Sequence, residues 1–211
     1  MKSFIELKEA HDKLRIGLSD NFNIRMHRSL SWLKKAELEK DPDAIFIFLW
    51  ISFNSAYSAQ DNEKDSKIRS DFLILLYRFG KKEIDKIIVE NFQNEIYEIL
   101  DNEYLMTKYW DGPAYEFQDD KIQDKQRAQN ALSFSEKNSK VTLDILFRRM
   151  NVLRNQIFHG YTTQNSSYNR KSVENSSQLM LRFIPLFIEI MINNPSIEWG
   201  EIDFHPDGIN K

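Results

Sequence analysis

Apolar residues recur at every third or fourth position through most of this chain, which is the spacing that buries one face of an α-helix. The clearest apolar stripe lies within residues 139–159 and consists of Leu143, Leu146, Phe147, Met150, Leu153 and Ile157. Ser139 suits an N-cap, and Gly160 suits the C′ position, because glycine readily adopts the left-handed backbone found there. The sequence therefore predicts one long helix over 139–159.

The same period predicts helices over most of the remaining chain. They cover residues 3–18, 24–40, 42–59, 71–79, 81–108 (as one long or two shorter helices), 119–132 and 172–193. The 42–59 helix is apolar on nearly all sides, so we expect it to be the central buried helix. Asn54 lies within it, and we expect its amide to hydrogen-bond to a neighbouring helix. The pattern predicts an all-α fold, an antiparallel helical bundle with additional helices.

The length of 211 residues suits one domain. No linker, internal repeat or low-complexity tract divides the sequence. We therefore expect a single helical domain over 1–211, with its core at about 23–193 and a C-terminal tail over 194–211.

Composition excludes several kinds of site. The chain has no Cys, which excludes disulfides, thiolate metal sites and cysteine nucleophiles. Its four His are scattered, and its six Gly form no phosphate-binding loop, so we expect neither a metal nor another cofactor. The longest apolar run, residues 44–51, is too short to cross a bilayer, and the N-terminus lacks the apolar core of a signal peptide. We expect a cytoplasmic protein that does not bind membranes.

Charge is unevenly distributed, although the net charge is only −3. Residues 137–171 carry seven bases and one acid, a net charge of +6, whereas residues 95–124 carry nine acids and two bases, a net charge of −7. These stretches form either two solvated faces of opposite sign, which touch within the fold or between subunits, or a local anion-binding patch around Arg154. We expect Arg148 and Arg149 to lie on the solvated surface.

The candidate chemistry lies at the end of the 139–159 helix. His159 follows Arg154 by five positions, which is about 140° around an ideal helix and ~7.5 Å along it. The two side chains therefore do not stack directly, but the long Arg154 side chain can turn toward the imidazole. Two cations that meet there would repel each other unless an anion lay between them. We expect this helix end to receive a phosphate or another acidic group.

Two segments carry a further pattern. One is Leu153–Gly160, with the sequence LRNQIFHG, and the other is Ile47–Tyr57, with the sequence IFLWISFNSAY. Together they resemble the HEPN superfamily, most closely its Apea-like branch. The resemblance implies a helical bundle that dimerises about a two-fold axis and brings two Arg/His pairs to one cleft. It also implies a metal-independent endoribonuclease of toxin–antitoxin, phage-defence or RNA-processing systems.

The resemblance also implies a role for each site residue. His159 would act as general base or acid, since histidine titrates near neutrality, Arg154 would hold two phosphate oxygens, and Asn155 would bond the phosphate or orient the pair. Tyr161 completes the pattern Arg-x4-His-x-Tyr, in which the tyrosine is adenylylated; the alternative is a tyrosine that covers the helix end. The implied partners are RNA, a second copy of the chain, and an antitoxin or nucleotidyltransferase.

A non-catalytic interpretation stands beside this one. Some HEPN folds serve only in dimerisation or nucleotide binding. In such a module for protein interaction or nucleotide binding, Arg154 would be a structural ion-pair partner and His159 a helix cap.

Overall fold

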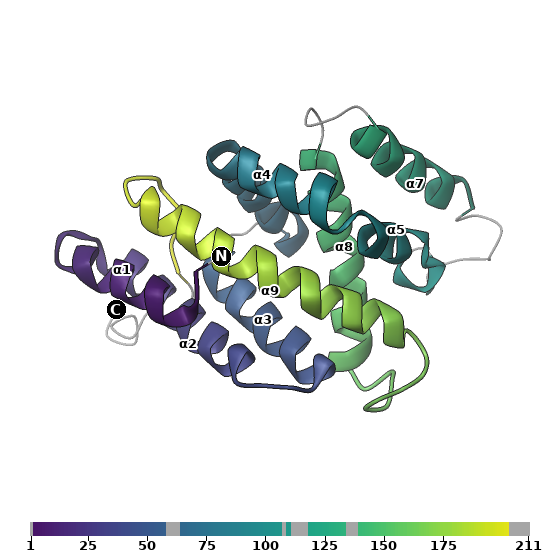
Figure 1. Cartoon of the computed structure of the whole chain (residues 1–211), viewed down its shortest axis with the longest axis horizontal. Helices are drawn as coiled ribbons and strands as arrows, with labels where there is room; N and C mark the ends of the chain where they lie inside the picture. The colour runs from purple at the N-terminus through teal and green to yellow at the C-terminus, as the bar shows by residue number, and fades with distance from the viewer. Residues whose placement is uncertain (1, 58–63, 107–108, 111–117, 134–138, 203–211) are drawn as a thin grey trace.

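A computed structural model shows helices packed side by side (Figure 1). It describes residues 2–57, 64–106, 109–110, 118–133 and 139–202. The α-helices are α1 (Phe4–Leu14), α2 (Asp20–Glu37), α3 (Pro42–Tyr57), α4 (Asp65–Asp85), α5 (Gln93–Asp101), α7 (Gln118–Ser133), α8 (Ser139–Phe158) and α9 (Arg170–Asn193). Two 3-10 turns, η1 (Arg15–Gly17) and η3 (Glu103–Leu105), and one π-helix, η2 (Lys86–Asn91), complete the elements. No strand occurs in these described ranges, and the all-α prediction is confirmed.

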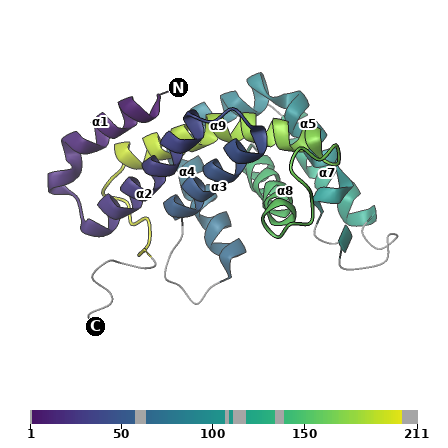
Figure 2. The same cartoon turned by 90° about the horizontal axis from the view of Figure 1, so that it is seen from below.

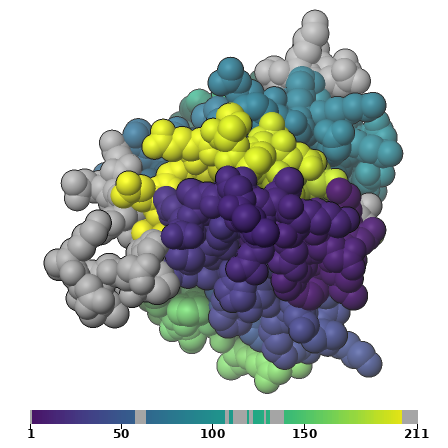
Figure 3. All heavy atoms as spheres, turned by 90° about the vertical axis from the view of Figure 1, so that its left-hand side faces the viewer, coloured from purple at the N-terminus to yellow at the C-terminus, as the bar shows by residue number. Residues whose placement is uncertain are grey.

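Helix α9 runs through the middle of the molecule and contacts α3, α4 and α5 (Figure 1). Helix α2 packs along α3, and α1 lies beside the C-terminal half of α9, as the side view in Figure 3 shows. Helix α8 crosses the bundle and carries α7 on its outer side; it is seen nearly end-on below α9 in Figure 2. Helix α8 also contacts α4 and α5.

Helix α3 is the central buried helix, as its apolar sequence predicted. All 16 of its residues are buried or half-buried. Its start is also as expected, since the Asp43 amide donates to the Asp41 carboxylate at 3.2 Å. Phe53 lies at the centre of an aromatic cluster, with its ring 4.7 Å from that of Phe147 in α8 and 6.1 Å from that of Phe187 in α9. This cluster connects three helices that the sequence places far apart.

The expectation for Asn54 is wrong. Its Oδ1 atom is buried and has no hydrogen-bond partner among the described residues. Two serines form a polar connection between α3 and α2. Ser52 Oγ donates to the Ser29 carbonyl at 2.7 Å, and Ser29 Oγ donates to the Ser52 carbonyl at 2.9 Å. These short side chains let the two backbones approach closely.

Helix α4 begins at Asp65, earlier than the expected residue 71. The expected end of that helix at residue 79 coincides with a kink at Gly80, whose φ of −124° and ψ of 26° are not helical, and a further helical turn follows the kink as far as Asp85. Ile190 of α9 packs directly against the Gly80 backbone. This close approach favours glycine at the kink.

The hydrophobic core extends beyond residues 23–193 at both ends. Leu7 of α1 is fully buried, and Trp199, which follows α9, is 7% exposed. The buried Arg25 side chain fixes this C-terminal segment, since its Nη1 donates to the Ala56 carbonyl at 2.6 Å and its Nη2 to the Gly200 carbonyl at 2.8 Å. Within the part of the chain that the structure describes, no helix combines the length and apolar character needed to cross a membrane.

Candidate functional site

The C-terminal end of α8 places His159 in solvent. Gly160 has φ +72°, its N–H donates to the Ile157 carbonyl at 3.1 Å, and the Tyr161 N–H donates to the Gln156 carbonyl at 2.8 Å. These two bonds form a Schellman motif, which confirms Gly160 as the C′ residue and makes His159 the C-cap. His159 is exposed, so its imidazole is accessible to a ligand. At the other end of α8, Ser139 is the first helical residue, not the expected N-cap.

Arg154 lies one turn earlier and is held by neighbouring side chains. Its guanidinium is 5.6 Å from the centre of the Trp50 ring in α3 and 5.9 Å from that of Phe158. Its Nη1 donates to Asn155 Oδ1 at 2.8 Å, while its Nε is buried without a hydrogen-bond partner in the described chain. No carboxylate among the described residues pairs with Arg154. The structural ion pair of the non-catalytic interpretation is therefore not formed within these residues.

The structure brings the four predicted site residues to one end of α8, where Arg154 bonds directly to Asn155 but not to His159. No hydrogen bond connects Arg154 to His159 within the described residues; Phe158 lies between them, with its ring 6.3 Å from the His159 ring. The His159 ring lies 6.0 Å from that of Tyr161, which is 77% exposed. The Asn155 side chain accepts from Arg154, while the Asn155 carbonyl accepts from the His159 backbone N–H at 3.0 Å. The guanidinium and the imidazole flank a single exposed phenylalanine.

A pocket of about 580 Å³ opens beside this helix end. Two predicted site residues, Asn155 and Tyr161, line it, whereas Arg154 and His159 do not. The other lining residues are Trp110, Asn151, Val152, Gln156, Thr162 and Tyr168. Trp110 and Tyr168 lie outside the helices that the apolar periodicity predicts, so the sequence pattern gave no reason to place them here. The spacing of Asn151 and Asn155, one helical turn apart, was the only available signal.

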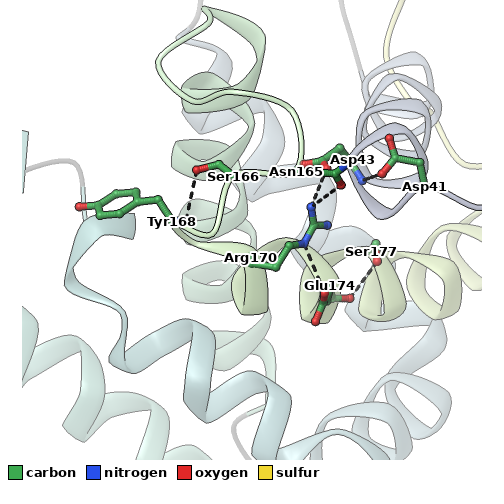
Figure 4. A network of polar contacts seen from close by, with 8 residues as sticks. All are labelled: Asp41, Asp43, Asn165, Ser166, Tyr168, Arg170, Glu174 and Ser177. Atoms are coloured by element: carbon green, nitrogen blue, oxygen red, sulfur yellow. Dashed lines mark hydrogen bonds and ion pairs between the residues drawn. The ribbon is translucent and has the colours of Figure 1, made fainter.

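The loop from Tyr161 to Asn169 is fixed at its far end by Arg170 (Figure 4). Arg170 Nη1 donates to Asp43 Oδ2 at 2.7 Å, and Arg170 Nε is 3.3 Å from Glu174 Oε1. The loop residue Asn169 donates to Gln156 Oε1 at 3.0 Å, which attaches the loop to α8. In Figure 4 the Tyr168 ring points away from the Arg170 cluster. These anchors hold one wall of the pocket in place.

Arg149 corrects the prediction of a solvated surface. It is 4% exposed, and its Nη2 lies 2.9 Å from Asp124 Oδ2 of α7. Burial lowers the pKa of Arg149, an effect that the Asp124 carboxylate opposes. Arg148 is solvated as expected and pairs with Asp144 at 3.2 Å. The oppositely charged stretches therefore touch within one chain, partly in a buried contact.

The tyrosines behind the pocket influence one another's ionisation. Burial raises the pKa of Tyr168 to about 12, and its hydrogen bond with Tyr104 acts in the same direction. Burial also raises the pKa of Tyr109, again with a contribution from Tyr104. Both phenols are therefore neutral donors at physiological pH.

Among the residues that the structure describes, no group of three or more His, Asp or Glu side chains is arranged to hold a metal ion. Comparisons of the chain with protein-family models, curated proteins and solved structures found no match. The geometry of this helix end and the two sequence segments around Trp50 and His159 are therefore the features that indicate a function.

Proposed function

We propose that this protein is a metal-independent endoribonuclease of the HEPN type. The observation that carries the proposal is the presence, at one end of α8, of an exposed His159 imidazole and an Arg154 guanidinium that has no carboxylate partner among the described residues. A guanidinium whose charge is not neutralised by a carboxylate suits a phosphate, whose oxygens accept two parallel hydrogen bonds. An accessible imidazole at the same helix end suits proton transfer near neutral pH.

The reaction requires two proton transfers. One His159 takes the proton of the RNA 2′-hydroxyl, and the resulting alkoxide attacks the adjacent phosphorus. A protonated imidazole then gives its proton to the departing 5′-oxygen, which leaves a 2′,3′-cyclic phosphate and a free 5′-hydroxyl. Arg154 stabilises the charge on the phosphorane. A homodimer supplies both imidazoles, one as base and one as acid.

The test is cleavage of RNA in EDTA by the purified protein. We expect products that end in 2′,3′-cyclic phosphate, and we expect His159→Ala to abolish them while the far-ultraviolet circular dichroism and the melting temperature stay unchanged. His27→Ala is the matched control, because His27 is also exposed but lies on α2. Intact RNA across several substrates, with any inhibitory partner removed, contradicts the proposal. Equal loss of cleavage in His27→Ala contradicts the assignment of His159.

Tyr161 is the proposed site of silencing by a nucleotidyltransferase partner. Its ring is 77% exposed and lies 6.0 Å from that of His159, so an AMP group on its hydroxyl would stand beside the imidazole. Incubation with a candidate nucleotidyltransferase and ATP is expected to add one AMP to the wild-type protein and none to Tyr161→Phe. AMP addition to Tyr161→Phe would exclude this site.

One observation favours a second function, a non-catalytic module for protein interaction or nucleotide binding. Arg154 packs against Trp50 and bonds to Asn155 in its own helix, which gives the guanidinium a structural role without substrate. This alternative expects no nuclease product and expects partner or nucleotide binding to survive His159→Ala.

A further inference from the structure

The described part of the chain lines the pocket beside α8 with uncharged side chains. None of these described lining residues carries a formal charge, although residues 137–171 have a net charge of +6. An isolated phosphate or metal ion would find no opposite charge among them. Three aromatic residues, Trp110, Tyr161 and Tyr168, stand among amide side chains. Rings and amides together suit a flat ligand that is neutral and that hydrogen-bonds at its edge.

The aromatic wall is held in place before any ligand arrives. Trp110 Nε1 donates to the Tyr104 carbonyl at 3.1 Å, and the Trp110 ring lies 5.0 Å from that of Tyr109. The Tyr168 ring lies 5.0 Å from that of Tyr104. The Tyr104 carbonyl also accepts from Gln156 Nε2 at 2.8 Å, which ties this cluster to α8. Trp110 is nevertheless 55% exposed, so one face of its ring is available for stacking.

The amides of the pocket are not equally available. Gln156 is occupied at both ends, since its Oε1 accepts from Asn169 and its Nε2 donates to the Tyr104 carbonyl. A guanidinium can only donate, so Arg154 fixes the Asn155 amide with Oδ1 toward itself. The Nδ2 donor of Asn155 has no partner among the described residues. The Asn151 amide has none in the same part of the chain. The two asparagine side chains therefore offer the pocket two NH2 donor groups and one free carbonyl oxygen, that of Asn151.

We propose that this pocket binds one nucleobase, which stacks on Trp110 and hydrogen-bonds at its edge to Asn151 and Asn155. Nucleobases combine a flat π face with donors and acceptors at one edge, which is the combination that this lining complements. A fatty chain would leave the two amides unpaired, and a free phosphate would leave the rings without a partner.

The pocket adjoins the proposed catalytic residues, so a bound base can position the RNA for cleavage. Tyr161 belongs to the pocket wall, and its ring is 6.0 Å from that of His159. Asn155 belongs to the pocket and holds Arg154. A base in the pocket therefore leaves its ribose and phosphate next to the imidazole and the guanidinium. This part of the inference rests on the proposed ribonuclease function and deepens it, because the pocket then selects the nucleotide beside the cleaved bond.

The test separates binding from cleavage. A short oligonucleotide with 2′-O-methyl riboses, which has no free 2′-hydroxyl, is titrated against the full chain and followed by tryptophan fluorescence and by calorimetry. We expect Trp110→Ala to weaken binding by roughly 5-fold to 150-fold, the range of one base–aromatic stack. We expect Asn151→Ala to weaken it as well. Trp32→Phe is the matched control, because Trp32 is 37% exposed on α2 and does not line the pocket.

We expect the oligonucleotide to quench the tryptophan fluorescence of the wild-type protein. Quenching that disappears in Trp110→Ala and persists in Trp32→Phe supports the nucleobase pocket, whether or not RNA is cleaved. Binding that is equal in wild type, Trp110→Ala and Asn151→Ala overturns the pocket, while cleavage of ordinary RNA by the same protein leaves the proposed ribonuclease standing. Binding of the oligonucleotide that is lost only in Arg154→Ala also overturns it, because contact would then be made to phosphate alone. The nucleobase pocket is likewise overturned if an abasic oligonucleotide binds as tightly as the one that carries bases.

Discussion

The guanidinium of Arg154 lies 5.6 Å from the centre of the Trp50 ring, and Trp50 is 1% exposed. This contact joins the central helix α3 to the end of α8 that carries His159. It also turns the guanidinium so that Nη1 reaches Asn155 at 2.8 Å. The buried Trp50 ring therefore helps to position the Arg154 guanidinium in the candidate site.

Removing this contact is expected to lower stability. Arg154→Ala loses a partly desolvated cation–π interaction, so we predict a decrease of about 0.5–2 kcal/mol in the free energy of unfolding. A double-mutant cycle with Trp50→Leu should give a coupling energy in the same range, about 0.5–2 kcal/mol. Urea unfolding measures both. Arg148→Ala is the control, since that neighbour is solvated. A coupling energy of zero would show that the two side chains are merely adjacent.

The turn that exposes His159 depends on Gly160. Because Gly160 has φ +72°, we predict that Gly160→Ala lowers the free energy of unfolding by about 1–2 kcal/mol, even though a Cβ there meets nothing within 4 Å. Gly17 is the control, because a Cβ on it also meets nothing within 4 Å and its φ is not positive. Gly17→Ala should leave stability unchanged or raise it slightly. Equal losses in thermal melts of the two variants would argue against a backbone origin.

Much of the fold follows from helical period alone. The 139–159 stripe predicts α8 to within a residue, and the apolar 42–59 segment predicts the central helix, because burial along a helix is a local property of the sequence. The C-terminal end of α8 could also be predicted from the local sequence, because glycine readily adopts the positive φ that the C′ position requires. The kink at Gly80 also has a non-local component. The same residue type there serves contact with Ile190, more than 100 positions away.

The candidate site, like the fold, could be predicted from the sequence only in part. Its residues at the end of α8 could be found by spacing, but its pocket could not. Trp110 and Tyr168 lie outside the helices that the periodicity predicts, and hydrogen bonds to the Tyr104 carbonyl and to Gln156 place their segments. Arg149 was assigned to the surface because a charged residue on an amphipathic helix is usually solvated. Its burial depends on Asp124, which α7 brings to it.

That buried ion pair gives a further prediction. Asp124→Asn leaves the Arg149 charge buried without its carboxylate, so we expect a loss of about 3–5 kcal/mol in the free energy of unfolding. Arg149→Met removes the charge as well and should cost less. Asp101→Asn is the comparison, since Asp101 pairs with Lys125 at 2.5 Å on the exposed side of α7 and should cost about 1 kcal/mol or less. Denaturant unfolding ranks the three variants. A smaller loss for Asp124→Asn than for Asp101→Asn would contradict the buried pair.

Close packing at Gly80 predicts an overpacking effect. A Cβ at this position would lie 2.1 Å from Ile190 Cδ1 and 2.9 Å from its Cγ1, so Gly80→Ala should destabilise the fold by about 1–3 kcal/mol. Ile190→Val removes the Cδ1 methyl and alone should cost about 0.5–1.5 kcal/mol. In the double variant the added methyl occupies the space of the deleted one. The loss of unfolding free energy in the double variant should therefore be smaller than the sum of the losses in the two single variants. If the losses of unfolding free energy measured by calorimetry are simply additive, the Ile190 side chain is not the reason why glycine is needed at position 80.

His11 makes stability depend on pH. It is 5% exposed, and its Nε2 donates to Asn23 Oδ1 at 2.9 Å. The orientation of that amide is fixed, because Asn23 Nδ2 donates to the Arg15 and Leu18 carbonyls. Burial lowers the pKa of His11 below its usual value, and the hydrogen bond to Asn23 only partly opposes this effect.

The sign follows from linkage. Below about pH 6.5 the unfolded chain binds a proton at His11 more readily than the folded chain does, so acidification favours unfolding. The contribution of neutral His11 is therefore fully present above that pH and is lost as the pH falls toward the lowered pKa. Urea midpoints should decrease between about pH 7.5 and pH 5.5, and His11→Phe should flatten that decrease. His27→Ala, which removes an exposed imidazole, should keep it. If His11→Phe retains the full slope, the proton uptake occurs elsewhere, and the contact between α1 and α2 is not the pH-sensitive part of the fold.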